Sequence, residues 1–143
     1  MKRLFYLLLL LLVVTACSTS RNTATTRWWQ AFVTRYNVYY NATTAYREGE
    51  AAQRSGLKDD YTQMLPLFGV AYPQQQNLGK GNFETAVTKC EKAIQLHSIK
   101  KRPQIAPGRN TSPQLKAYLS RKEFNPFLKN AWLLMGKAQF QQG

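Results

Sequence analysis

The chain has 143 residues, enough for one domain, and its 20 Lys and Arg outnumber its 7 Asp and Glu to give a formal net charge of +13. One His, two Cys and seven scattered acids do not supply the several closely spaced ligands that a zinc or iron site needs. Because no catalytic residue set is visible either, we expect no metal, no enzyme, no cofactor and no small-molecule substrate.

The first segment has the pattern of an export signal. Lys2–Arg3 are positively charged, Leu4–Val14 form an apolar run, and Thr15–Ala16 are small. Such a run spans about 16 Å as a helix, which is short of the ~30 Å hydrocarbon core of a bilayer. We therefore interpret residues 1–16 as a signal peptide that is removed, and not as a permanent membrane span.

The residues that follow carry a second signal. Val14–Cys17 resembles the lipobox of bacterial lipoproteins, in which the Cys thiol receives a diacylglyceryl group before cleavage. We expect Cys17 to be the lipidated first residue, and at ~0.8 kcal/mol per buried CH₂ its acyl chains would hold the protein on a membrane. By resemblance to lipoprotein sorting in Gram-negative cells, Ser18 favours the outer membrane, with the chain facing the periplasm. An ordinary signal peptide with an accidental Cys is the alternative.

Residues 17–26 are predicted to be the lipidated Cys and a Ser/Thr/Asn-rich tether, and residues 27–143 a helical region. One long helix is predicted over about Arg27–Gln53, with Ser55–Gly56 as its stop. Its stripe at helical spacing consists of Trp28, Phe32, Tyr36, Tyr39, Thr43 and Tyr46. We predict that this stripe faces the core, although a stacking platform for sugars or bases is an alternative.

The next two segments are predicted from carboxylates and prolines. Asp59 and Asp60 favour the first turn of a short helix that runs through Met64, since carboxylates are stabilised near helix N-termini. Leu65–Pro73 is then expected to be an extended apolar strap across the helices.

A helix is predicted from a cap at Asn82 to about His97. Ala86, Cys90 and Ala93 match the small-large-small spacing of the second helix of a tetratricopeptide repeat (TPR), with Cys90 as a small buried hydrophobe. Cys90 and His97 are not a catalytic pair, because seven residues separate them by about 10 Å along the helix. The full predicted face is Phe83, Ala86, Val87, Cys90, Ala93, Ile94 and His97.

Ile99–Asn110 is predicted to be a basic loop, because its prolines forbid a regular helix. A possible contact patch in it consists of Lys100, Lys101, Arg102 and Arg109; a solvated crossover is the plain alternative. For an exported chain, nucleic acid is not an expected partner, whereas anionic lipid head groups, lipopolysaccharide or an acidic protein surface fit its charge. Ser112–Pro113 then begins a short helix that is predicted to end near Lys122.

The last segment has the most regular pattern. Asn125 is predicted to cap a helix with Pro126 at its first position, and Gly136 to allow close approach of a neighbouring helix. The predicted apolar face is Leu128, Ala131, Trp132, Met135, Ala138 and Phe140. Trp132, Met135 and Gly136 fall on the W-x2-L-G positions that open a TPR, so we expect the second helix of this repeat to follow Gly143 in a longer protein.

Four segments in order, Arg35–Asn41, Lys58–Pro66, Ala93–Ser98 and Glu123–Trp132, resemble the N-terminal part of the PorW/SprE-type TPR lipoproteins of Bacteroidetes. The resemblance implies an all-α, TPR-like array of helical hairpins, the start of an α-solenoid. Members of that family are outer-membrane lipoproteins, and some are needed for type IX secretion and gliding. It therefore implies a non-enzymatic, membrane-anchored adaptor that docks other envelope proteins, such as secretion or gliding components. The partner groove is not defined by this half repeat, because a solenoid needs about three repeats to bury its own core.

Two further hypotheses remain open. The basic loop and Trp28–Trp29 fit a module that binds lipopolysaccharide or peptidoglycan directly. A SusD-like nutrient-binding lipoprotein would also be helical and on the outer membrane, but the acidic-aromatic stretch usual after its lipidated Cys is missing from Ser18–Arg21.

Overall fold

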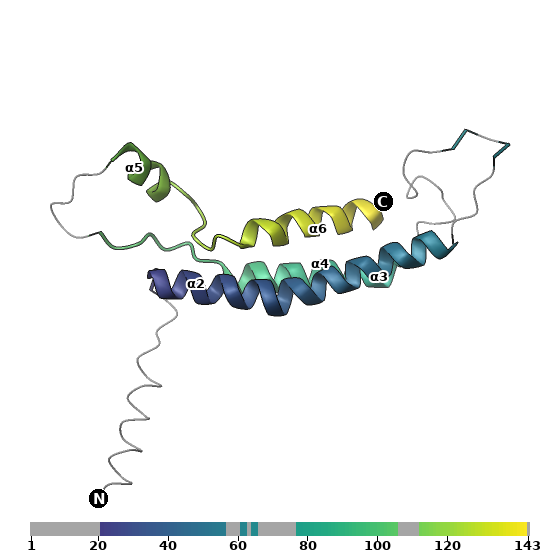
Figure 1. Ribbon diagram of the computed structural model, residues 1–143, viewed down its shortest axis with the longest axis horizontal. Coiled ribbons are helices and arrows are strands. Elements are labelled where there is room, and N and C mark those ends of the chain that lie inside the picture. The colour runs from purple at the N-terminus through teal and green to yellow at the C-terminus, as the bar shows by residue number, and fades with distance from the viewer. Residues whose placement is uncertain (1–20, 57–60, 63, 66–76, 106–111, 143) are drawn as a thin grey trace, which may run out of the picture.

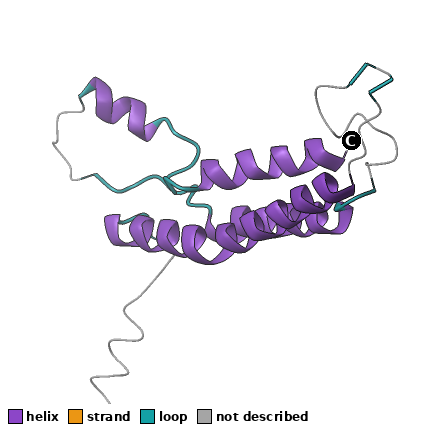
Figure 2. Ribbon diagram, turned by 45° about the vertical axis from the view of Figure 1, so that its right-hand side comes forward, coloured by secondary structure: helices purple, strands orange, loops and turns teal. Residues whose placement is uncertain are grey.

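The structure is a computed structural model that describes residues 21–56, 61–62, 64–65, 77–105 and 112–142 (Figure 1). Its regular elements are α2 (Ala24–Val33), a π-helical turn η1 (Thr34–Tyr39), α3 (Tyr40–Gly56), α4 (Lys80–His97), α5 (Pro113–Leu119) and α6 (Leu128–Gln142). Figure 2 shows these ranges as helices joined by loops, without a strand among them, so the predicted all-α class is confirmed there. The predicted signal peptide, Cys17, and nearly all of the predicted strap Leu65–Pro73 lie outside the described residues.

Helix α2, the turn η1 and helix α3 form one continuous helix from Ala24 to Gly56. It begins three residues before the predicted start, because the Thr23 hydroxyl accepts a hydrogen bond from the Thr26 N–H and caps it. Inside the helix, Thr34 Oγ1 donates to the Gln30 carbonyl at 2.6 Å. A hydroxyl that bonds back to the preceding turn competes with the backbone ladder, which is consistent with the wider π turn that begins at Thr34.

Helix α4 is the central helix of the fold. It packs along both α3 and α6, which touch each other only slightly. The interior consists of three layers, each with one or more residues from each of three elements. From the α2 end outward these are Val38, Ala93 and Ala131; then Ala42, Cys90 and Leu134; then Ala45, Phe83, Ala86 and Ala138.

The first half of the aromatic stripe is exposed, which contradicts the prediction that it faces the core. Trp28, Phe32 and Tyr36 are 63%, 44% and 58% exposed, whereas Tyr39 and Tyr46 are half-buried beside the core. The buried line of the long helix is a neighbouring row of mostly small residues, Thr34, Val38, Ala42, Ala45, Gly49 and Gln53. Small side chains let α4 approach closely, so the large rings are placed beside the contact and not within it.

Helices α4 and α5 lie close to their predicted positions. The first residue of α4 is Lys80, two residues before the predicted start, because Gly79 adopts a left-handed backbone (φ 72°) and caps the helix in place of Asn82. At the start of α5, the Ser112 hydroxyl accepts a hydrogen bond from the Leu115 N–H at 3.2 Å, as the Ser-Pro pair predicts. The helix ends at Leu119 and not near Lys122.

Helix α6 differs from its prediction in which face is packed. Its buried residues are Leu128, Ala131, Leu134 and Ala138, whereas Trp132 and Phe140 are 53% and 55% exposed. A Cβ built at Gly136 has no described atom within 4 Å, so none of the described residues makes the predicted close approach at this glycine. The packed face is therefore rotated about the helix axis relative to the predicted face. Leu134, which was not predicted to be buried, packs against Ala42 and Cys90, and the predicted Met135 is only partly buried beside them.

The close approach that the sequence places at Gly136 occurs instead at Gly49 of α3. A Cβ on Gly49 would lie 2.8 Å from two carbons of the Phe83 ring. Phe83 itself is fully buried and meets the Tyr46 ring edge-on, with 5.6 Å between the ring centres. Gly49 therefore makes room for the largest fully buried side chain of the described core.

The short helix predicted from Asp59 to Met64 is not formed in the residues described there. Tyr61 and Thr62 form a turn, and Met64 is 97% exposed outside any helix. Asp59 and Asp60 lie outside the described residues, so their predicted role in the first turn stays a prediction.

Candidate functional site

A polar junction joins the end of α4 to the segment that leads into α6. The Glu123 carboxylate accepts hydrogen bonds from the backbone N–H groups of Ile99, Phe124 and Asn125 at 2.8, 3.0 and 2.7 Å, and from the Ser98 hydroxyl. The Phe124 N–H also donates to the Ile99 carbonyl at 3.0 Å. These bonds hold the extended segment that begins at Ser98 against the entrance to α6, and so fix where the basic loop leaves the bundle.

Asn125 connects the same junction to the long helix. Its side chain is 4% exposed, and its Nδ2 donates to the His97 carbonyl at 2.9 Å and to Thr34 Oγ1 at 3.2 Å. Its Oδ1 accepts from the Phe127 N–H at 3.0 Å. Asn125 thus caps the turn before α6, as predicted, although the regular helix begins only at Leu128. The same amide also bridges α4 and η1, a contact that local sequence patterns do not predict.

His97, the last residue of α4, lies beside this junction. Its Nδ1 is 2.6 Å from Gln30 Oε1, and because an amide oxygen only accepts, Nδ1 is the donor. Burial lowers the pKa of His97 below its ordinary value, since the charged form loses hydration. The ring is therefore neutral at neutral pH and holds α2 to the end of α4 without carrying charge.

We expect the free energy of unfolding to fall as the pH drops below about 6.5. The unfolded chain has an ordinary His pKa near 6.5 and takes up a proton first, so stability is lost between that pH and the lower pKa of the folded state. Urea unfolding at pH values on either side of this window measures the loss. His97→Asn keeps a side-chain N–H donor and should remove most of the pH dependence of the unfolding free energy, because the chain has one His. If this variant kept the same pH dependence, other titratable groups would be its cause.

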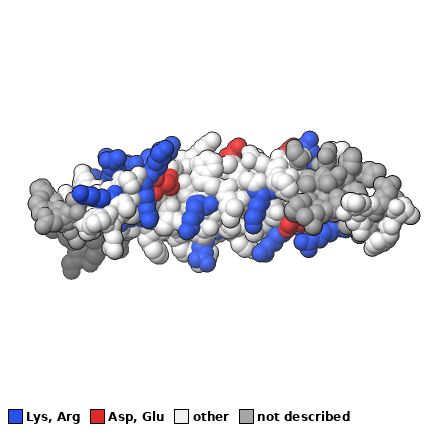
Figure 3. Space-filling view, turned by 90° about the horizontal axis from the view of Figure 1, so that it is seen from above, with Lys and Arg blue, Asp and Glu red and all other residues white. Residues whose placement is uncertain are grey.

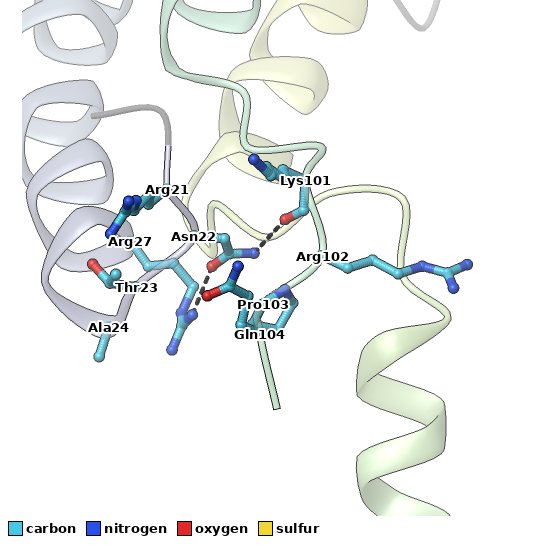
Figure 4. A pocket seen from close by; sticks show the side chains of 9 residues that line it. All are labelled: Arg21, Asn22, Thr23, Ala24, Arg27, Lys101, Arg102, Pro103 and Gln104. Carbon is cyan, nitrogen blue, oxygen red and sulfur yellow. Dashed lines mark hydrogen bonds between the residues drawn. The ribbon is translucent and has the colours of Figure 1, made fainter. Parts of the chain in front are cut away.

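An open pocket of about 520 Å³ lies at the N-terminal end of α2 (Figure 4). Asn22 is 8% exposed and ties together the two segments that line it: its Nδ2 donates to the Lys101 carbonyl at 2.6 Å, and its Oδ1 accepts from the Arg27 guanidinium at 2.6 Å. The lining residues are Arg21, Asn22, Thr23, Ala24, Arg27, Lys101, Arg102, Pro103 and Gln104. We call this the basic pocket.

The basic pocket is lined by four cationic side chains and no carboxylate. Figure 4 shows Arg21 and Arg27 on the α2 side, with Lys101 and Arg102 on the extended segment opposite. Figure 3 shows the same bias on the face seen from above, where Lys and Arg are spread along the molecule and few acids are visible. Such an arrangement attracts phosphate or carboxylate groups and repels cations.

The predicted contact patch is only partly brought together. Lys101 and Arg102 line the basic pocket, Lys100 is exposed but does not line it, and Arg109 lies outside the described residues. Sequence reasoning missed Arg21 and Arg27, because they fall in the segments interpreted as a tether and as the start of a helix. The only available signal was the absence of any acid near them in the sequence.

The other predicted site residues are placed as follows. Ala86, Cys90 and Ala93 are buried along α4, Met135 is partly buried, and Trp132 and Gly136 are exposed on α6. Burial raises the pKa of the Cys90 thiol to about 11, so this Cys stays protonated and is a poor nucleophile near neutral pH. Within the described ranges, no group of three or more His, Cys, Asp or Glu residues is placed to hold a metal ion.

None of the described helices has both the length and the apolar character needed to cross a bilayer. Residues 1–18 match the family model for the prokaryotic membrane lipoprotein lipid attachment site, and Cys17 is the one Cys in that range. No curated protein matches the chain in sequence. The lipid attachment site indicates that the chain is a membrane-anchored lipoprotein.

Proposed function

We propose that this lipoprotein is a non-enzymatic adaptor of the outer membrane, facing the periplasm, that docks other envelope proteins through its helices. The observation that carries the proposal is the lipid attachment site at residues 1–18, followed by a helical body whose described residues place no group of three or more His, Cys, Asp or Glu to hold a metal ion. In the helical body, α6 presents the exposed large side chains of Trp132 and Leu133, the kind of residue that partner proteins cover.

The finer form of the proposal is a TPR-type adaptor of an envelope machine such as type IX secretion or gliding. It rests on the resemblance of four segments to PorW/SprE-type lipoproteins and on the W-x2-L-G positions of Trp132, Met135 and Gly136. The antiparallel packing of α4 against α6 is compatible with helical hairpins that stack. The exposed Trp132 and Gly136 are compatible with a further helix of a longer array, which would cover this face.

We expect Cys17→Ala to abolish acylation and to remove the protein from the outer-membrane fraction, because the thiol that carries the acyl chains is lost and none of the described helices can cross a bilayer in their place. Intact mass spectrometry of the mature protein reads the acyl chains, and density-gradient fractionation reads the location. Secretion or gliding in the native cell should be lost to the same extent in this variant and in a deletion strain.

Ser18→Asp is the matched control, because it leaves the acylated Cys in place and changes only the sorting residue. We expect it to be acylated but retained at the inner membrane. A wild-type protein without acyl groups would contradict the anchor. Full activity of the envelope machine in the deletion strain would contradict the adaptor role while leaving the anchor intact.

A further inference from the structure

A continuous aromatic surface covers the outward side of α2 and the first residues of η1. We call it the aromatic ladder, and it consists of Trp28, Trp29, Phe32 and Tyr36. The ring centres of Trp28 and Phe32 are 5.5 Å apart, those of Trp29 and Phe32 6.2 Å, and those of Phe32 and Tyr36 4.9 Å. All four side chains are exposed, and none lies on the buried line that faces α4. Aromatic side chains exposed as one patch mark a surface that another phase or molecule covers.

The ladder lies in a cationic stretch. From Ser18 to Arg47 the chain contains four Arg and no carboxylate, and Glu48 is the first acid of the mature sequence. The Arg35 guanidinium lies 5.1 Å from the centre of the Tyr36 ring, within cation–π distance. Arg27 and Arg21, which line the basic pocket, continue the positive charge to the end of α2 nearest Cys17.

The shallow groove beside the ladder indicates what kind of surface covers it. Ala31, Pro126 and Phe127 complete its lining, and Arg35 is its only charged residue. No carboxylate or side-chain amide lines this groove, although a sugar-binding platform needs such groups to pair with hydroxyls. A two-fold contact between copies of the chain, centred on this groove, would bring Arg35 close to another Arg35, which like-charge repulsion disfavours.

The lipid anchor places a bilayer within reach of the ladder. Ala24 is seven positions after Cys17, so the start of α2 lies at most ~25 Å from the acylated residue. Trp and Tyr concentrate at the level of lipid head groups, and Arg is attracted to anionic phosphate there. Rings and cations on one helix, without acids, are the combination that an interfacial amphipathic helix uses.

We propose that the aromatic ladder is a second membrane contact, which lays α2 on the head-group region of the same bilayer that holds the acyl chains of Cys17. This inference rests on the anchoring in the proposed function, because the acyl chains supply the proximity. The ladder then fixes the orientation of the helical body, with the outward face of α2 on the lipid and the exposed residues of α6 left available to partner proteins.

The test uses the acylated lipoprotein reconstituted in vesicles of phosphatidylcholine, phosphatidylglycerol and a brominated phosphatidylcholine in equal parts. The chain has three Trp, so Trp132→Phe leaves Trp28 and Trp29 of the ladder as the reporters. Replacing both of those by Phe leaves Trp132 of α6 as the matched control. We expect roughly half or more of the ladder emission to be quenched, because interfacial rings lie next to the first acyl carbons, and the Trp132 emission to be nearly unaffected.

Equal quenching of the two reporters, or none of either, would overturn the ladder contact. A blue shift of the ladder emission that depends on protein concentration but not on bromine would assign the surface to a second copy and would also overturn it. Mass spectrometry of the same sample reads acylation independently. An acylated protein whose ladder is not quenched therefore refutes this inference and leaves the proposed anchor standing.

Discussion

Phe83→Ala is expected to cost about 3–5 kcal/mol of unfolding free energy, the usual range for truncating a fully buried ring. Phe83 is 0% exposed, meets the Tyr46 ring edge-on, and fills the space that Gly49 leaves open. Its layer otherwise contains only Ala45, Ala86 and Ala138 as buried residues. Alanine side chains cannot extend into the space that the ring vacates, so the cavity should persist and the loss should fall at the upper end of the range.

Chemical denaturation of the full chain measures this loss, and Leu96→Ala supplies the control. Leu96 is on the same helix α4 but is 60% exposed, so its truncation should change the unfolding free energy by no more than about 0.5 kcal/mol. If Phe83→Ala were no more destabilising than Leu96→Ala, α4 would not be the central helix that the structure shows.

Gly79→Ala is expected to have the second large effect, through the backbone. A left-handed conformation costs a residue with a Cβ about 1–2 kcal/mol, and Gly79 has a φ of 72°. A Cβ there would also lie 2.6 Å from the carbonyl oxygen and 2.9 Å from the Cα of Gly49. Because these are backbone atoms, no rotamer change relieves the clash, and overpacking of this kind costs a further ~1–3 kcal/mol. A fall in the melting temperature of the full chain measures the sum.

Gly81→Ala is the matched control for Gly79→Ala. Gly81 is two residues further on, inside α4, and a Cβ there has nothing within 4 Å. Replacing a helical glycine by alanine in open space should stabilise the chain by up to about 1 kcal/mol. A destabilising Gly81→Ala would show that α4 does not begin at Lys80.

The helices themselves could be predicted because their signals are local. Ser112 and Asn125 accept the hydrogen bonds that their cap positions predict, and the apolar spacing of Phe83, Ala86, Cys90 and Ala93 identifies the buried face of α4. Each of these signals depends on residues within a few positions of one another. Lipidation at Cys17 was predictable for the same reason, since the attachment site is a short continuous motif.

Which side of each helix is buried could not be predicted in the same way. In the long helix, both the aromatic stripe and the row of small residues beside it have helical spacing, and hydrophobicity favoured the larger rings. The fold buries the small row because Ala42, Ala45 and Gly49 let α4 come close enough to bury Phe83. In α6, the buried residue Leu134 and the half-buried Met135 are adjacent, and only the position of α4 decides between them.

The basic pocket depends on contacts between distant parts of the sequence. Asn22 and Lys101 are 79 residues apart, and the bond between them joins the N-terminal segment to the extended segment that Glu123 and Asn125 hold at the end of α4. Hydrophobic periodicity and amino-acid composition do not predict such contacts between distant residues. A run of Lys100–Arg102 therefore indicated that a basic surface exists, but not that Arg21 and Arg27 complete it.

The long helix has no break between Ala24 and Gly56, and this affects how the protein transmits force. At ~1.5 Å per residue, Ala24 to Gly56 measures about 50 Å from end to end. The long helix has no loop at which it could bend, and α6 is joined to it both by packing on α4 and by the hydrogen bond from Asn125 to Thr34, so a pull applied to α6 is carried to the end of the long helix nearest the lipidated Cys17. Tension between a partner and the membrane should therefore be transmitted to the anchor and not dissipated within the fold.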